Sequence, residues 1–224
     1  MKLCVIAASM PEDDLFIPQG SFCIAADRGF EQLQCRGIEP DLAVGDFDSL
    51  GYVPNAREVV RHPVEKDDTD MMLAVREGLR RGYREFILYG GVGGRLDHTL
   101  ANVQTLAFLR KNGVRALLYG EGTAVTLLHN DALRFPETAS GTISVLCFGG
   151  EAEGVTERGL YYSLENARME CSLPRGVSNE FCGRESEVSV QNGKLLLLWE
   201  STAKAACEVV FGPAPCARRY GSGE

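Results

Sequence analysis

Several features that mark whole classes of protein are missing from this sequence. Its apolar runs are all shorter than about ten residues, which is too short to cross a bilayer. It has no cluster of Lys and Arg, and its formal net charge is −8, which argues against a protein that binds nucleic acid through phosphates. Its eight cysteines include no Cys-x-x-Cys pair, the usual spacing of zinc and redox sites. We therefore expect no membrane, nucleic-acid or zinc partner.

The sequence has the composition of an ordinary globular protein. Its 224 residues are 45% apolar and 24% charged, enough for one large domain or two small ones. The apolar run at residues 3–8 is too short for a signal peptide and is interpreted as a buried strand. Thiols without a metal or redox spacing are typically reduced inside the cell, so we expect a cytoplasmic protein.

The first half alternates short apolar runs with helical patterns, which predicts βαβ units and a mainly parallel, Rossmann-like sheet. Strands are expected at residues 3–8, 22–26, 42–44, 58–61, 85–89 and 116–119. Apolar side chains recur at helical spacing near 72–79 and 100–107, and Gly82 and Gly113 follow these segments where a left-handed helix end is expected.

After Gly120 the pattern becomes one of short strands separated by turn residues. Strands are expected at residues 124–129, 142–148, 187–190 and 195–199, with a hairpin turn at 191–193 because Asn-Gly suits tight hairpins. The sequence therefore predicts an α/β domain (1–122), then an all-β sandwich domain (123–203). Residues 204–224 are expected to form a tail of uncertain structure, and the segment from 201 onward a terminal strand and a loose end.

Acidic residues follow the predicted strands of the first half, at the edge where open α/β sheets bind ligands. Asp27 closes the second strand, and Asp46 and Asp48 follow the third. Asp70 and Asp97 open the two long helices. Converging carboxylates with oxygen ligands suit Mg²⁺, which would assist phosphoryl transfer.

Simpler structural roles compete with this interpretation. Asp70 and Asp97 are also good helix caps, and the segment 46–49 is a common turn sequence. The loop 90–94 holds four glycines between a strand and a helix, which lets a backbone approach an anion, but it is neither a Walker A loop nor a dinucleotide fingerprint. Arg95 could grip a phosphate there or simply be solvated.

Five segments together show a family resemblance. They are Ala26-Asp27-Arg28-Gly29, Gly45-Asp46-Phe47-Asp48-Ser49, Lys66-Asp67-Asp68-Thr69-Asp70, Gly90-Gly91-Val92-Gly93-Gly94-Arg95-Leu96-Asp97-His98 and Gly176-Val177-Ser178-Asn179-Glu180-Phe181. In this order they resemble the thiamine pyrophosphokinase (thiamine diphosphokinase) family across roughly residues 2–200. The resemblance implies a homodimer whose thiamine site lies between the α/β domain of one subunit and the sandwich of the other. It also implies Mg²⁺-dependent transfer of the diphosphoryl group of ATP to thiamine, with AMP as the second product.

The same resemblance implies roles for individual residues. Asp46, Asp48 and Asp70 match the Mg²⁺ ligands and, with Asp97, the catalytic set. The residues that match ATP and phosphate contacts are Asp27, Lys66, Asp67, Thr69 and Arg95. Those that match thiamine contacts are Asp97, Ser178 and Asn179.

Some points depart from the family pattern or stay open. Arg28 stands where many relatives have Gly. The aromatic surface for thiamine is unassigned, with Trp199 and Phe181 as candidates beside their alternative as core residues. The alternatives are a related pyrophosphokinase acting on a pterin alcohol, a non-catalytic nucleotide- or thiamine-binding module, and a hydrolase using the same carboxylates.

Overall fold

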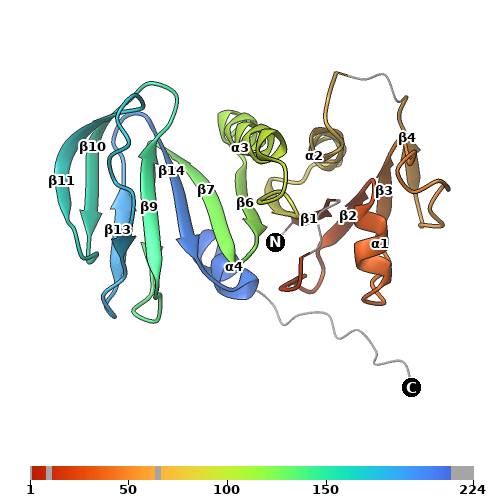
Figure 1. The fold of residues 1–224 in the computed structure, drawn as a ribbon, viewed down its shortest axis with the longest axis horizontal. Helices are drawn as coiled ribbons and strands as arrows, with labels where there is room; N and C mark the ends of the chain where they lie inside the picture. Colours follow the sequence, from red (N-terminus) through yellow and green to blue (C-terminus); the bar gives the residue numbers. More distant parts are fainter. Residues whose placement is uncertain (1, 9–11, 64–66, 213–224) are drawn as a thin grey trace.

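The computed structural model describes residues 2–8, 12–63 and 67–212, and combines a parallel α/β half with a β-sandwich (Figure 1). The first half contains the strands β1 (Leu3–Ala7), β2 (Phe22–Ala26), β3 (Leu42–Gly45), β4 (Val59–Arg61), β5 (Glu85–Tyr89) and β6 (Arg115–Gly120). Each lies within a residue or so of its predicted range. All their pairings are parallel, in the order β6-β5-β1-β2-β3-β4. The direction of winding reverses between β1 and β5, which makes this position the switch point of the sheet.

Two layers of helices cover this sheet. Helices α2 (Asp70–Arg80) and α3 (Leu96–Lys111) pack on one face. Helices α1 (Gly29–Gln34) and α4 (Ala203–Phe211) pack on the other. The predicted left-handed ends are confirmed, because Gly82 and Gly113 have φ values of 87° and 70°.

The repeat near 100–107 correctly predicts α3, but the side of the helix that meets the core is a different one. Leu106 and Leu109 are buried with Asn102 and Thr105, whereas Leu100 is 56% exposed. Polar Asn102 and Thr105 bond backbone carbonyls, which lets them occupy the core-facing side. An apolar strip consequently remains on the outer side of α3.

The second half adds strands to the first sheet and forms a second sheet that packs against them. Its strands are β7 (Thr123–His129), β8 (Ala132–Phe135), β9 (Thr142–Cys147), β10 (Glu151–Arg158), β11 (Leu164–Glu170), β12 (Asn179–Glu180), β13 (Ser186–Ser189) and β14 (Lys194–Glu200). Strands β12, β9, β14 and β7 continue the parallel sheet into one of ten strands. Strands β11, β10, β13 and β8 form a separate antiparallel sheet of four that packs against it. The predicted fold class, an α/β half followed by a β-sandwich, is therefore confirmed.

The two halves are joined by a tight turn. Strand β6 pairs antiparallel with β7 across Glu121 and Gly122, whose φ values are 51° and 72°. Two consecutive residues with positive φ are typical of a type I′ hairpin, whose twist matches that of the strands. The expected domain boundary at 122/123 falls in this turn, across which the sheet is continuous.

The predicted hairpin at 191–193 is wrong. Strand β13 pairs with β10 and β8, whereas β14 pairs with β7 and β9 in the other sheet. The segment 191–193 therefore crosses from one sheet to the other. Gly193 passes so close to its neighbours that a Cβ would lie 2.5 Å from the carbonyl oxygen of Glu151, which explains a glycine at this crossing.

The terminal strand expected after residue 201 is also wrong, because this segment begins helix α4. Thr202 caps the helix by accepting a hydrogen bond from the backbone N–H of Ala205. Ala203, Ala206 and Val210 then recur at helical spacing and are buried against the sheet. Among the described residues, no helix has the length and apolar character needed to cross a membrane.

Candidate active site

A cavity of about 410 Å³ opens at the carboxyl ends of the parallel strands, at the switch point of the sheet. Its walls come from the ends of β1 and β2, the start of α2, the glycine-rich loop after β5 and the first turns of α3. The lining residues are Ala8, Ala26, Thr69, Asp70, Met71, Gly90, Gly91, Gly93, Gly94, Arg95, His98, Ala101 and Asn102. The structure therefore brings together three of the predicted site residues, Thr69, Asp70 and Arg95.

The glycine-rich loop is held in place by the helix that follows it. Asn102 donates a hydrogen bond of 3.0 Å to the carbonyl of Gly91, and Thr99 donates one of 3.1 Å to the carbonyl of Gly93. At Gly91 a Cβ would lie 2.5 Å from the Cδ1 of Leu118, so a larger residue would displace that side chain. Four of the five residues in the loop are glycines, so the loop, fixed by α3, exposes mostly backbone to the cavity. Such a surface suits phosphate oxygens.

Arg95 adds a positive charge at the start of α3. It occupies the N-cap position, and its own side chain makes no capping hydrogen bond. Its guanidinium pairs with Asp97 at 2.5 Å, with both side chains more than 60% exposed. This pairing lowers the pKa of Asp97, and Asp97 does not line the cavity. Asp97 does not occupy the N-cap position, but its Oδ1 accepts a hydrogen bond of 3.0 Å from the backbone N–H of His98 and so satisfies one donor of the first helical turn.

Asp46 and Asp48 share the loop after β3, as predicted. The backbone N–H of Asp48 donates to the Oδ1 of Asp46 at 3.1 Å. Phe47 between them has a φ of 61° and is buried in the core, which anchors the loop despite its strained backbone. Neither aspartate lines the cavity.

Asp27 anchors the Asp46–Asp48 loop through a hydrogen bond with Ser49. It is only 7% exposed, and its Oδ2 accepts a hydrogen bond of 2.5 Å from the hydroxyl of Ser49. Its Oδ1 is buried and has no hydrogen-bond partner among the described residues. Asp27 has a φ of 48° and lies so close to Gly45 that a Cβ there would be 3.2 Å from the Asp27 Cα. Asp27 and the Asp46–Asp48 loop therefore form one packed unit.

The acidic segment before α2 is only partly described. Thr69 caps α2 by accepting from the backbone N–H of Met72 at 3.2 Å, so the capping alternative for Asp70 is wrong. Asp70 is the first residue of the helix and lines the cavity. Asp67 is exposed, and Lys66 lies outside the described residues.

The donor chemistry of this edge fits Mg²⁺. Asp46, Asp48 and Asp70 offer carboxylate oxygens, the ligands that this ion prefers. Within 2–8, 12–63 and 67–212, no three His, Cys, Asp or Glu side chains lie close enough to hold a metal by themselves. Mg²⁺ commonly takes one or two carboxylates and completes its shell with phosphate oxygens and water. The arrangement thus suits an ion that arrives with a phosphorylated substrate.

Ser178 and Asn179 lie in the sandwich and take no part in this cavity. Ser178 is exposed with a φ of 59°, and its backbone N–H donates to the hydroxyl of Ser144. Asn179 is 3% exposed and bonds to protein atoms only. Within one chain, the structure does not bring these residues together with the phosphate-side candidates.

Two features near the candidates had no signal in the sequence. The carboxylate of Glu121 lies against the glycine-rich loop, where a Cβ on Gly93 would be 2.3 Å from its Oε1. Tyr161 and Tyr162 are each 64% exposed beside the Ser178–Asn179 segment, with their ring centroids 4.8 Å apart. The two aromatic candidates Trp199 and Phe181 instead pack against Phe135 in the core.

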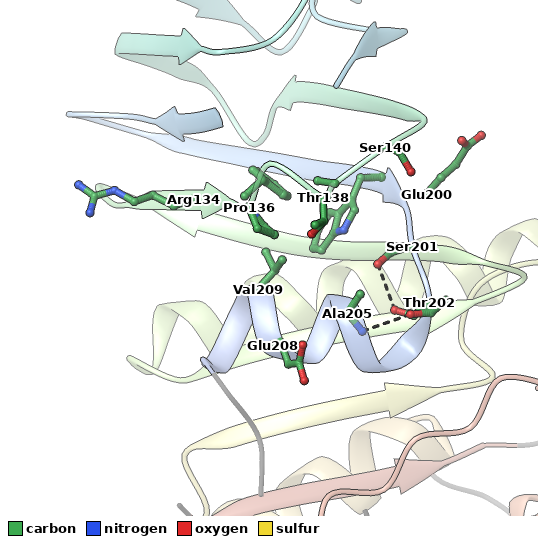
Figure 2. A pocket seen from close by; sticks show the side chains of 13 residues that line it. Arg134, Pro136, Thr138, Ser140, Glu200, Ser201, Thr202, Ala205, Glu208 and Val209 are labelled. Atoms are coloured by element: carbon green, nitrogen blue, oxygen red, sulfur yellow. Dashed lines mark hydrogen bonds between the residues drawn. The ribbon is translucent and has the colours of Figure 1, made fainter. Parts of the chain in front are cut away.

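A larger cavity, about 570 Å³, lies between α4 and the segment that follows β8 (Figure 2). None of the predicted site residues lines it. Several of its polar groups already have partners: Ser201 donates to the carbonyl of Thr202, whose hydroxyl caps α4. Glu200 accepts from the backbone of Thr142, and Glu208 pairs with Lys204. We place the candidate active site at the smaller cavity because the glycine-rich loop, Arg95 and Asp70 line it.

A parallel sheet with a glycine-rich loop, Arg95 and Asp70 at its switch point, continued into a β-sandwich, defines a two-part α/β protein whose cavity suits a phosphorylated ligand. Comparison with known proteins identifies the family. Residues 14–118 match the model of the thiamin pyrophosphokinase catalytic domain, and residues 132–197 match that of the thiamin pyrophosphokinase vitamin B1 binding domain. The chain belongs to the thiamin pyrophosphokinase family and is an enzyme of this kind, a kinase.

Individual relatives agree over the full length. The thiamine pyrophosphokinase of Bacillus subtilis (strain 168) is 27% identical over 210 residues, which cover 88% of this chain and 98% of that protein. The crystal structure of thiamine pyrophosphokinase from Bacillus subtilis has a TM-score of 0.78 at 25% identity and covers 89% of this chain and 99% of its own. A thiamin pyrophosphokinase family protein from Enterococcus faecalis has a TM-score of 0.76 at 26% identity, with coverages of 90% and 99%.

Proposed function

We propose that this protein transfers the diphosphoryl group of ATP to the hydroxyl of thiamine, giving thiamine diphosphate and AMP. The observation that carries the proposal is the cavity at the switch point. There the glycine-rich loop, Arg95 at the start of α3, and Asp70 line one cavity in a chain of this family. Residues 1–122 would supply the nucleotide and phosphate site, and residues 123–203 the thiamine site.

The phosphates of ATP would lie along the glycine-rich loop. Backbone N–H groups and the start of α3 favour negative charge, and Arg95 can donate two parallel hydrogen bonds to phosphate oxygens. Asp27, Lys66, Asp67 and Thr69 complete the proposed nucleotide side, with Asp27 acting through the loop that it packs against.

Asp46, Asp48 and Asp70 would hold Mg²⁺ together with the phosphate oxygens. When bound, the ion would offset the charge that develops on the oxygen bridging the α- and β-phosphorus atoms. The chain's own part is to orient these three carboxylates. The Asp46–Asp48 loop does so through the buried Phe47 and the Asp27–Ser49 hydrogen bond.

Asp97 is our candidate for the group that accepts the proton of the thiamine hydroxyl. Its pairing with Arg95 suggests a second role, in which Asp97 orients the guanidinium. A carboxylate whose pKa is lowered by a guanidinium is a weaker base and a better anchor for that guanidinium. Asp97→Asn separates the two roles. A large loss of kcat supports the base, whereas weaker substrate binding at unchanged kcat rules it out.

The thiamine site requires a second copy of this chain in our proposal. Ser178 and the exposed rings of Tyr161 and Tyr162 lie in the sandwich, and the rings offer π faces to the thiazolium cation. The phosphate cavity of the same chain contains none of them. Leu96 and Leu100 of α3, 71% and 56% exposed, are apolar surface that a homodimer would cover. Sedimentation equilibrium tests this: a monomer at micromolar concentration contradicts the shared site.

The deciding experiment for the reaction follows the nucleotides and the thiamine species together. The protein is incubated with ATP and Mg²⁺, with and without thiamine. We expect AMP to form in step with thiamine diphosphate, and only when thiamine and Mg²⁺ are both present. Release of ADP or phosphate without an acceptor would indicate a hydrolase. Formation of AMP with a pterin alcohol but not with thiamine would indicate that the substrate is a pterin. Binding of the substrates without turnover would indicate a non-catalytic module. A cytoplasmic location remains a further proposal.

A further inference from the structure

A carboxylic acid is buried in the sandwich at a point that the reaction chemistry does not explain. Glu157, on β10, is 1% exposed, which is rare for an acidic residue. Its Oε2 accepts a hydrogen bond of 2.9 Å from the Nδ2 of Asn179, and its Oε1 has no hydrogen-bond partner among the described residues. Burial raises the pKa of Glu157, and the hydrogen bond from Asn179 and the nearby Arg175 act in the opposite direction. The bond connects the two sheets, because β10 lies in one and β12 in the other.

Every hydrogen-bonding group of the Asn179 side-chain amide is bonded to another protein group. Its Oδ1 accepts from the backbone N–H groups of Tyr162 and Glu180, both at 2.9 Å. Its Nδ2 donates to the carbonyl of Tyr162 at 2.7 Å and to Glu157. Two donors and one acceptor oxygen are thereby satisfied. Asn179 consequently acts on its surroundings by holding backbone, with no donor left for a ligand.

What Asn179 holds is the loop that carries the two exposed tyrosines. Its amide grips Tyr162 from both the N–H and the C=O side, and the N–H of Tyr161 donates to the carbonyl of Glu180 at 3.0 Å. An isolated bridge between Leu160 and Phe181 extends this attachment. The backbone of Tyr161 and Tyr162 is thus held against Asn179 and Glu180, which directly follow Ser178 in the chain, and this attachment depends on how the Asn179 amide is oriented.

We propose that Glu157 is a positioning residue of the thiamine site, which through Asn179 fixes the Tyr161–Tyr162 loop beside Ser178. The inference rests on the proposed function. The carboxylate is the second acceptor for Nδ2 and so completes the set of bonds that locks the amide. Without it, one buried N–H loses its partner, and the amide can rotate away from the Tyr162 backbone. The tyrosine loop then samples several orientations, and thiamine binds more weakly.

Kinetics of three Glu157 variants test this inference. Glu157→Ala removes the acceptor and should raise the KM for thiamine about tenfold, the loss that one buried hydrogen bond typically causes, while kcat and the KM for ATP stay near wild-type values. Glu157→Asp shortens the side chain by one methylene and should raise the same KM. Glu157→Gln keeps a carbonyl oxygen in place and should restore it. Glu153→Ala, an exposed glutamate on the same strand, is the matched control.

The outcomes separate the possibilities. If Glu157→Ala and Glu157→Asp lower the melting temperature but leave the KM for thiamine unchanged, Glu157 is merely structural and the inference is wrong. If Glu157→Ala does not fold, the comparison of Glu157→Asp with Glu157→Gln decides. A wild-type protein that binds ATP but makes no thiamine diphosphate overturns the proposed function and this inference with it. An active wild type with unaffected variants overturns the positioning role alone.

Discussion

The hydrogen bond from Ser49 to Asp27 offers a sharp test of how the acidic loop is held. Asp27 is 7% exposed and already has one oxygen, Oδ1, without a partner among the described residues. Ser49→Ala removes the donor to Oδ2, so both oxygens of a buried carboxylate are left unsatisfied. Leaving a buried group unpaired costs about 1–3 kcal/mol. For a chain of this size, that corresponds to a fall in melting temperature of roughly 2–12 °C.

The same substitution should affect the metal site. The Asp46–Asp48 loop loses one of its anchors, so the Mg²⁺ concentration for half-maximal activity should rise, while the KM for thiamine stays unchanged. Thermal unfolding followed by circular dichroism and a Mg²⁺ titration of activity measure the two effects. Ser140→Ala removes an exposed hydroxyl from the other half and serves as control. A Ser49→Ala protein with wild-type melting temperature and Mg²⁺ requirement would refute the reasoning.

Three further predictions concern the proposed site and its support. Asp46→Asn and Asp48→Asn should fold normally yet lose nearly all activity, because each removes a carboxylate from the proposed ion; wild-type turnover in either variant contradicts the assignment. Gly93→Ala should raise the KM for ATP, since its φ of 90° is unfavourable by about 1–2 kcal/mol for alanine and its Cβ would meet Glu121. Gly37→Ala, with a φ of 67° and open space around it, should lower stability only. The raised pKa of Glu157 means that the folded state binds a proton more tightly than the unfolded state does. Stability should therefore fall as pH rises above about 4.5, and urea unfolding of Glu157→Gln should show a weaker fall.

Local patterns predict much of the α/β half. Buried parallel strands are continuous apolar runs, and helices show their own spacing, so β1 to β6, α2 and α3 are recognisable one segment at a time. The acidic residues and the glycine loop follow because they stand directly after those strands. The common edge where they meet is a general property of parallel sheets.

The β half shows where local patterns fail. Strand β11 is mostly exposed and β10 is rich in glutamate, so neither has the apolar alternation that predicts a strand. Asn192-Gly193 has the composition of a hairpin turn but joins two sheets, because its flanking strands find other partners. Helix α4 has a clear cap and apolar spacing at residues 202–210. These local features indicate a helix there, although a strand was expected.

The local elements, the chemistry of the acidic and glycine loops, and the family resemblance can all be predicted from the sequence. That both halves share one ten-stranded sheet, that Ser49 bonds to Asp27, and that Glu157 and Asn179 hold the tyrosine loop becomes visible only in the folded protein. The physical reason is range. Helix and strand formation depends on neighbours a few residues apart, whereas the Asp27–Ser49 and Glu157–Asn179 hydrogen bonds each join residues 22 positions apart, and they exist only once the sheets are packed.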